Sequence, residues 1–129
     1  MRATIDIPDQ VIIDMIITAL EGGSNYWYYL PDITMVTGER RVPLAERIAQ
    51  QCLAGTAVIP VYDKDDIDED TGFPMEGKEK LGDLSKENIE RAVLTYCQNE
   101  QAISDDLDYD INDTDVLFQY IILNDIVYG

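Results

Sequence analysis

Four stretches of the chain carry apolar residues at the three- and four-residue spacing of an amphipathic helix. The pattern predicts helices over about 9–21, 43–54 and 85–97, and a last helix from about 114 onward. The first three have ordinary start signals, because Asp9 and Ser85 can cap a helix and Pro43 suits a first turn. The last has apolar side chains on more than one face, which predicts burial on several sides.

Shorter runs rich in aromatic and β-branched residues predict three or four strands. They cover residues 3–7, 26–30 with a continuation through 33–36, and 57–62. Pro60 lies inside the last run, and because proline has no N–H for a sheet ladder we expect an edge strand or a bulge there. Helices and strands do not alternate strictly, so the sequence predicts an α+β fold with about four helices packed on a short three- or four-stranded sheet.

The composition fits one domain over residues 1–129, because 46% apolar residues are enough for a core at this length. The charge is far from balanced: 26 Asp and Glu against 9 Lys and Arg give a net charge of -17. Such a chain repels nucleic acid and anionic membranes and favours basic partners. No signal peptide or membrane span is predicted, and Cys52 and Cys97 fall on apolar helix faces, where reduced thiols pack well. We therefore expect a cytoplasmic protein in a host cell.

Histidine is absent, which removes the commonest general base and the commonest transition-metal ligand. We therefore expect no enzyme activity, no catalytic residues and no cofactor. The alternation of Asp66, Asp68 and Asp70 suits the oxygen ligands of calcium. A helix–loop–helix calcium loop that starts at Asp66 would need a glycine and an acid where Thr71 and Gly77 stand, so we predict a solvated acidic loop without a metal site.

Acidic side chains concentrate in two predicted loops, near 63–82 and 104–113. Together these loops could present carboxylates in an array comparable to the phosphates of a nucleic acid strand. A protein built in this way would occupy the nucleic-acid-binding groove of another protein. The predicted partner contacts are Asp65, Asp66, Asp68, Asp70, Asp106, Asp108 and Asp110. High net charge also keeps a small protein dispersed, and solubility alone is the alternative explanation.

The aromatic run 26–29 suggests a different kind of site. Alternate residues of a strand share a face, so Tyr26 and Tyr28 would form a stacking platform for a planar ligand. Arg40 and Arg41 belong to the basic cluster of the chain and could bind a phosphate. These four residues predict a nucleotide-like ligand site as the alternative function. Core packing of the aromatic rings and local ion pairs of the arginines are the simpler explanations of the same residues.

Two segments resemble a group of small phage and prophage proteins of unknown function: TALEGGSNYWY at 18–28, and DVLFQY at 115–120 with the terminal IVYG at 126–129. The resemblance covers about a third of the chain and carries no known catalytic or binding residues. It implies a phage setting. We therefore predict an acidic interaction protein of a phage or mobile element, with counter-defence inhibition at the nucleic-acid-binding site of a basic host protein as the leading hypothesis. The alternatives are the small-ligand binder and a structural or assembly protein of a phage, and the oligomeric state stays open.

Overall fold

The computed structural model describes residues 7–104 and 109–128, and its elements follow one another in the order of an α+β domain. They are α1 (Asp9–Thr18) with its π-helical extension η1 (Ala19–Gly23), β1 (Tyr28–Tyr29), α2 (Leu44–Ala54), β2 (Ile59–Asp63), the short 3-10 helix η2 (Lys64–Asp66), β3 (Gly82–Leu84), α3 (Lys86–Asn99) and α4 (Ile111–Leu123). The predicted fold class is therefore confirmed.

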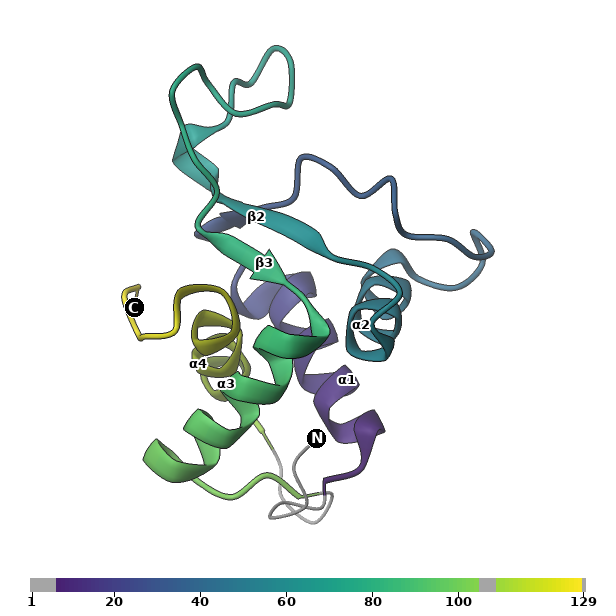
Figure 1. The fold of residues 1–129 in the computed structure, drawn as a ribbon, viewed down its shortest axis with the longest axis vertical. Coiled ribbons are helices and arrows are strands. Elements are labelled where there is room, and N and C mark those ends of the chain that lie inside the picture. Colours follow the sequence, from purple (N-terminus) through teal and green to yellow (C-terminus); the bar gives the residue numbers. More distant parts are fainter. Residues whose placement is uncertain (1–6, 105–108, 129) are drawn as a thin grey trace.

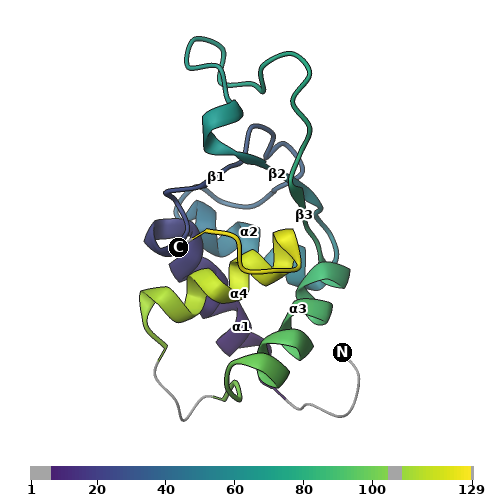
Figure 2. The same ribbon diagram turned by 90° about the vertical axis from the view of Figure 1, so that its left-hand side faces the viewer.

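The sheet has three antiparallel strands in the order β1-β2-β3, and the helices lie together on one side of it (Figures 1 and 2). Ile59 and Val61 of β2 and Leu84 of β3 are fully buried against these helices. Pro60 stands in the central strand, which at first sight contradicts the expected edge. However, β1 pairs only with Tyr62 and Asp63, so at Pro60 the strand has β3 on one side and no paired strand on the other, which is an edge environment.

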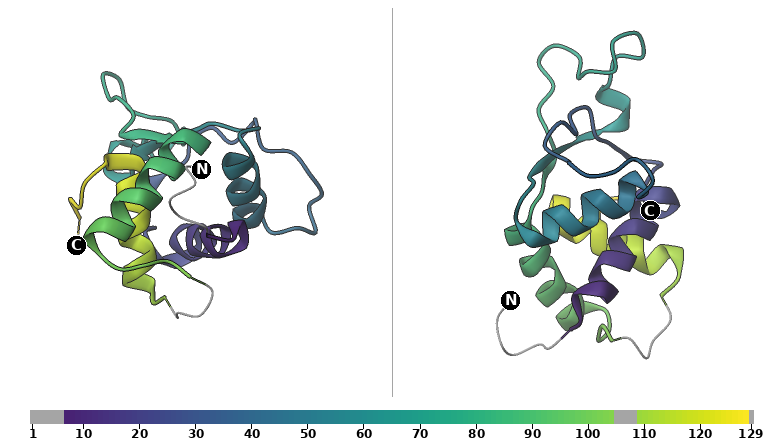
Figure 3. Two further views of the ribbon diagram at one scale, coloured as in Figure 1. Left: turned by 60° about the horizontal axis from the view of Figure 1, so that its bottom comes forward. Right: turned by 90° about the vertical axis from the view of Figure 1, so that its right-hand side faces the viewer.

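The helices pack in two pairs around a common core. In Figure 3, α1 and α2 lie side by side, and α3 lies across α4. Apolar side chains from all four helices meet in one cluster, in which Ile16, Cys52, Val93 and Phe118 are at most 1% exposed. As predicted for the last helix, α4 is buried on several faces. In the part of the chain that the structure describes, no helix combines the length and the apolar character needed to span a membrane.

The helix ends confirm most of the predicted signals. The Ser85 hydroxyl accepts a hydrogen bond from the N–H of Asn88 at 3.2 Å, and Gly55 ends α2 in the left-handed conformation with φ of 85°. Asp9 begins α1 but does not cap it. The last helix begins at Ile111, earlier than predicted, because Asp110 and Asp113 form a reciprocal capping box ahead of the apolar pattern.

The strand predictions are the ones that need correction. Residues 26–30 reduce to the two-residue strand β1, because the N–H groups of Trp27 and Tyr28 bond back to the Ser24 carbonyl in a turn. The expected continuation through 33–36 is another turn, closed by Val36 N–H on Ile33. The sequence pattern missed β3, which is short and lies at the end of an acidic stretch. Of the strand predicted over 3–7, residues 3–6 lie outside the described residues and Ile7 is not in a strand.

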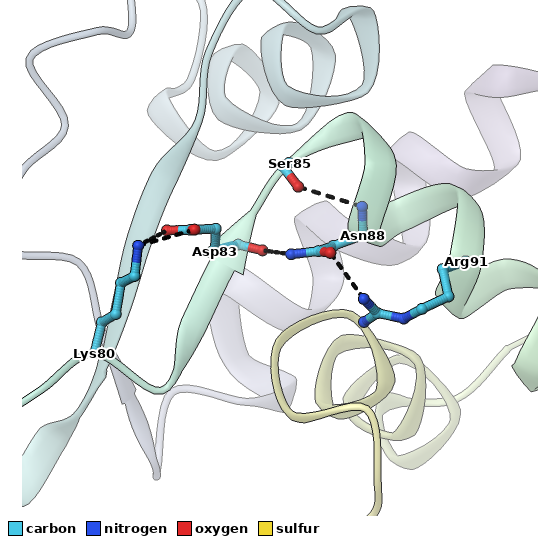
Figure 4. Close-up of polar contacts among 5 residues, drawn as sticks. All are labelled: Lys80, Asp83, Ser85, Asn88 and Arg91. Atoms are coloured by element: carbon cyan, nitrogen blue, oxygen red, sulfur yellow. Dashed lines mark hydrogen bonds and ion pairs between the residues drawn. The ribbon is translucent and has the colours of Figure 1, made fainter.

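A line of polar contacts joins β3, α3 and α4 (Figure 4). The ammonium of Lys80 binds the Asp83 carboxylate at 3.0 Å, and the Asn88 amide donates to the Asp83 carbonyl at 2.8 Å. Arg91 then donates to Asn88 Oδ1 at 2.8 Å. The same guanidinium reaches the carbonyls of Tyr120 and Ile121 at 3.0 Å each. Because the last turn of α4 has no basic side chain of its own, Arg91 supplies the cation that its terminal carbonyls favour.

Candidate functional site

The most prominent surface feature is a long excursion between β2 and β3, residues 63–82, which we call the acidic arm. It rises away from the helices and returns to the sheet (Figures 1 and 2). Between residues 63 and 80 it carries eight Asp and Glu against three Lys. Most of these charged side chains are exposed or only partly buried. The arm therefore places a strong negative charge at one end of the molecule.

The acidic arm holds its shape through its own hydrogen bonds. Asp68 N–H donates to the Phe73 carbonyl at 2.9 Å, and Gly72 N–H donates back to the Asp68 carbonyl at 2.8 Å. Met75 N–H also donates to the backbone carbonyl of Asp66 at 2.8 Å, and Ile67 pairs with Pro74 in an antiparallel bridge. The sequence predicted an irregular loop here. The structure instead gives a folded turn, which fixes where its carboxylates point.

Two apolar side chains stand among the carboxylates of the arm. Phe73 is 60% exposed and Met75 is 41% exposed. Aromatic residues and methionine are enriched where proteins contact one another, and lone exposed ones elsewhere on a surface are ordinary. On an arm that projects from the domain and carries its own fixed fold, these two side chains add apolar contact area to a charged surface.

The predicted contact residues do not all come together. Asp65, Asp66, Asp68 and Asp70 lie on the acidic arm, where the Asp66 carboxylate is 3.7 Å from the Lys78 ammonium. Asp110 caps α4, which begins in the half of the molecule away from the arm (Figure 2). Its carboxylate already accepts a bond from Asp113 N–H at 2.8 Å, so we leave it out of the candidate surface. Asp106 and Asp108 lie outside the described residues.

The alternating acids of the arm are engaged locally and do not form a cation cage. Asp68 Oδ1 accepts the N–H of Asp70 at 2.8 Å, and Asp66 faces Lys78. Among residues 7–104 and 109–128, no group of three or more Asp, Glu, His or Cys side chains is placed to hold a metal ion.

The tyrosine platform predicted from a regular strand does not form. The Tyr26 hydroxyl donates to Asp115 Oδ2 at 2.6 Å, whereas the Tyr28 hydroxyl donates to the Leu20 carbonyl at 2.5 Å. The turn at Ser24 rotates the two side chains apart. Arg40 is exposed, and Arg41 pairs with Glu39 at 2.5 Å on the surface. Of the cavities described around residues 7–104 and 109–128, none is lined by all four residues of the predicted nucleotide-like site.

Asp115 is the centre of a buried polar network that joins α4 to the turn after α1. Its Oδ1 accepts hydrogen bonds from the Ser24 hydroxyl at 2.7 Å and the Trp27 indole N–H at 2.9 Å. Its Oδ2 accepts from the hydroxyl of Tyr26 and from the Gln119 amide at 3.1 Å. A carboxylate offers about four lone-pair positions, and the protein's own donors fill them here. This buried acid therefore stabilises the fold and has no position left for a substrate.

The same network holds the chain's last described residues against the domain. Gln119 Oε1 accepts the N–H groups of Val127 at 2.8 Å and Tyr128 at 2.9 Å. The Tyr128 ring stacks on Trp27 with 5.0 Å between centroids and 11° between planes. Its hydroxyl then donates to Asp63 Oδ2 at 2.7 Å, at the base of the acidic arm. A continuous set of contacts thus runs from Asp115 to the arm.

We predict a loss of stability at alkaline pH from the ionisation of Tyr128 and Tyr28. Burial, followed by the nearby Asp63 carboxylate, raises the pKa of Tyr128 to about 12, and burial followed by the charge of Glu21 raises the pKa of Tyr28 to about 12. Both pKa values lie near 10 in the unfolded chain. Neutral tyrosine is therefore favoured by the fold, and this stabilisation is complete below pH 10 and is lost as the pH rises from about 10 to about 12. Urea unfolding across that range should show the decline.

The control for the alkaline effect is Tyr128→Phe, which should flatten the pH dependence because one of the shifted groups is gone. Absorbance at 295 nm, which follows tyrosinate, should show late ionisation in the folded protein and ordinary ionisation in urea. Stability that stays constant between pH 10 and 12 would contradict the shifted pKa values.

An apolar pocket of about 410 Å³ opens between β1 and α2, beside the base of the arm. Tyr28, Tyr29, Leu30, Leu44, Ile48 and Lys64 are among the residues that line it. Cys52 of α2 faces the core and does not line this pocket; burial raises the pKa of its thiol to about 12, so it stays protonated at neutral pH. Of the predicted ligand residues only Tyr28 reaches the pocket. Lys64, Tyr29 and Leu44 were missed, because their approach depends on tertiary packing that no local pattern encodes.

Comparison with known proteins adds no family to this description. No protein-family model, no curated protein and no solved structure matches the chain. The resemblance of residues 18–28, 115–120 and 126–129 to phage proteins therefore stays a prediction.

Proposed function

We propose that this protein is an acidic interaction protein whose arm binds a basic surface of a partner. The observation that supports the proposal is the fixed shape of the acidic arm, which projects from the domain with eight acidic and three basic side chains between residues 63 and 80. A partner that presents Arg and Lys for a nucleic acid backbone has the complementary charge. The protein would compete with nucleic acid for that surface.

The arm suits such a role better than the second acidic segment does. Its backbone bonds hold Asp65, Asp68 and Asp70 on an ordered turn, so little conformational entropy is lost when a partner binds them. Phe73 and Met75 supply apolar area beside the charges. In contrast, the described part of the 104–113 segment contributes Asp110 and Asp113, whose carboxylates are both engaged in the capping box of α4.

The proposed setting is a phage or mobile element, and the proposed target is a host defence protein that binds nucleic acid. This part follows from the resemblance of residues 18–28, 115–120 and 126–129 together with the net charge of -17. A target of this kind offers a basic groove, and a protein without histidine can block such a groove without any chemistry.

Neutralising the arm should weaken partner binding. We expect the variant Asp65→Asn, Asp68→Asn, Asp70→Asn to reduce binding of a captured basic partner by about tenfold or more, because it removes charge complementarity while Asn keeps the acceptor oxygens of the arm's turns. Binding should also fall steeply as salt rises. The measurement is affinity capture of tagged protein from host lysate at low and high salt, followed by titration of the purified partner with and without competing nucleic acid.

The matched control removes the same charge outside the arm, in Asp14→Asn, Glu87→Gln, Asp125→Asn, which are exposed acids of α1, of α3 and of the segment after α4. This control should keep most of the binding. Equal losses in the two variants would show that only net charge matters and would contradict a role for the arm. Binding that persists at high salt, or a partner that nucleic acid does not displace, would contradict occupation of a nucleic-acid-binding surface.

A further inference from the structure

A second hollow adjoins the apolar pocket on the side of the acidic arm. It measures about 430 Å³, and Asp65, Asp68 and Glu69 line it. Tyr29 and Lys64 line both this acidic hollow and the apolar pocket. The two therefore meet across the same two side chains. The surface thus has an apolar half and an acidic half in direct continuity.

The two halves differ sharply in chemistry. The apolar pocket is lined mainly by Leu, Ile, Ala and Tyr side chains, with Asn25 and Lys64 as its polar members and no carboxylate in its wall. The acidic hollow has three carboxylates from a short stretch of the arm. Each is of the size that holds a side chain or a small ligand group. An occupant that satisfies both must carry an apolar group beside positive charges.

Lys64 is the one cation at the boundary. Its ammonium donates to the Asn25 carbonyl at 3.4 Å, which is a long contact, and the side chain is exposed. For an anionic ligand this ammonium would be the attractive group, and for a cationic one it would be repulsive. The effect of the Lys64 charge on binding therefore discriminates between an anionic and a cationic occupant. Three carboxylates against one ammonium in the acidic hollow favour the cationic occupant.

We propose that this double hollow binds a basic peptide segment of the partner, with one large apolar side chain in the apolar pocket and flanking Arg or Lys residues on the acidic hollow. The inference rests on the proposed function, since it assigns the partner chemistry for the same arm. Beyond net charge, it adds an apolar anchor, which is the partner side chain that fills the apolar pocket. Selectivity among basic partners would then come from the anchor, because many basic surfaces share the charge alone.

The test uses blocked five-residue peptides with two arginines on each side of a central residue, which is leucine, phenylalanine or serine. Their affinities are measured by fluorescence anisotropy at low salt. We expect the leucine and phenylalanine peptides to bind about tenfold more tightly than the serine peptide, from burial of the apolar side chain. Leu44→Ser, which removes an exposed wall of the pocket, should shrink this preference several-fold. The control Val58→Ser, at an exposed apolar position outside the lining, should not.

Lys64→Met keeps the length of the side chain and removes its charge. This variant should bind the leucine peptide about twofold more tightly or better, because a repulsive charge is gone. Weaker binding of the leucine peptide would assign the site to anions and overturn the inference. Ala45→Phe fills the pocket from α2 as a second route to the same loss of preference, with folding checked by circular dichroism.

The failure of the inference can be told apart from the failure of the proposed function. If the leucine, phenylalanine and serine peptides bind equally, and all weaken in Asp65→Asn, Asp68→Asn, Asp70→Asn, the arm binds charge alone. The inference is then overturned and the proposed function stands. If the arm variant leaves every peptide unaffected, both are overturned.

Discussion

Replacing Asp115 by alanine is expected to destabilise the protein by about 3 kcal/mol or more, because it leaves buried donors without a partner. The change removes two acceptor oxygens, which together accept four hydrogen bonds. Two of the donors left behind, the Ser24 hydroxyl and the Trp27 indole N–H, belong to residues that are 0% and 2% exposed. Each buried donor without a partner costs about 1–3 kcal/mol.

Urea unfolding at neutral pH measures this loss, and the chain has a convenient probe. Trp27 is its one tryptophan and donates directly to Asp115, so its fluorescence reports on the network itself. Asp115→Asn should lose less stability than Asp115→Ala, because its amide oxygen still accepts hydrogen bonds. The control Asp125→Asn, at an exposed acid after α4, should change stability by no more than about 0.5 kcal/mol. A loss below about 1 kcal/mol in Asp115→Ala would mean that water replaces the carboxylate.

The Asp115 network also ties stability to the proposed interaction surface. Gln119 bonds to Asp115 and holds Tyr128, and Tyr128 reaches Asp63 at the start of the arm. Residues from the segments quoted for the phage resemblance, 18–28, 115–120 and 126–129, thus meet here, through Trp27, Asp115, Gln119 and Tyr128. In this chain, these residues serve packing and hydrogen bonding. The arm, which carries the proposed function, lies outside both segments.

The helices could be predicted from the sequence because their signals are local. Ser85 and Gly55 act on neighbouring backbone groups, and a stripe of apolar residues identifies a buried face wherever the helix finally packs. The strands could not be placed as well, because β1 and β3 have two and three residues and gain their identity by pairing with β2. The π-helical end of α1 and the turn at Ser24 take residues 26 and 27 out of the strand. An alternation of residue types along the chain does not reveal such a turn.

The candidate site was predicted only where charge alone identifies it. The acidic arm is visible in the sequence as a dense run of Asp and Glu, whereas its hydrogen-bonded turn is not. Asp115 stood among 26 acids without distinction, yet a signal was present. Asp115 and Gln119 share the helical stripe of Phe118 and Ile122, and two polar residues on an apolar stripe indicate a buried polar pair. The partners of Asp115 on the turn after α1, about ninety residues earlier in the chain, could come only from the tertiary structure.

Gly82→Ala is expected to cost about 3 kcal/mol, because β3 passes directly over the end of α4. A Cβ at Gly82 would overlap the carbonyl oxygen of Ile122 and lie 3.1 Å from its carbonyl carbon. Neither atom can move easily, since Ile122 is buried in the last turn of α4 and Arg91 binds the two carbonyls before it. Overpacking of this kind costs about 1–3 kcal/mol, and contact with backbone places it at the upper end.

Thermal unfolding should therefore show a melting temperature lower by about 6–12 °C for Gly82→Ala. The control is Gly22→Ala, where the nearest atom to the new Cβ is the flexible Ile111 Cδ1 at 3.6 Å, and its melting temperature should change little. Equal behaviour of the two variants would mean that β3 and α4 separate without cost. Because β3 is the returning strand of the acidic arm, the same wedge should shift the arm's base, and partner binding by folded Gly82→Ala protein should fall while Gly22→Ala binds as before.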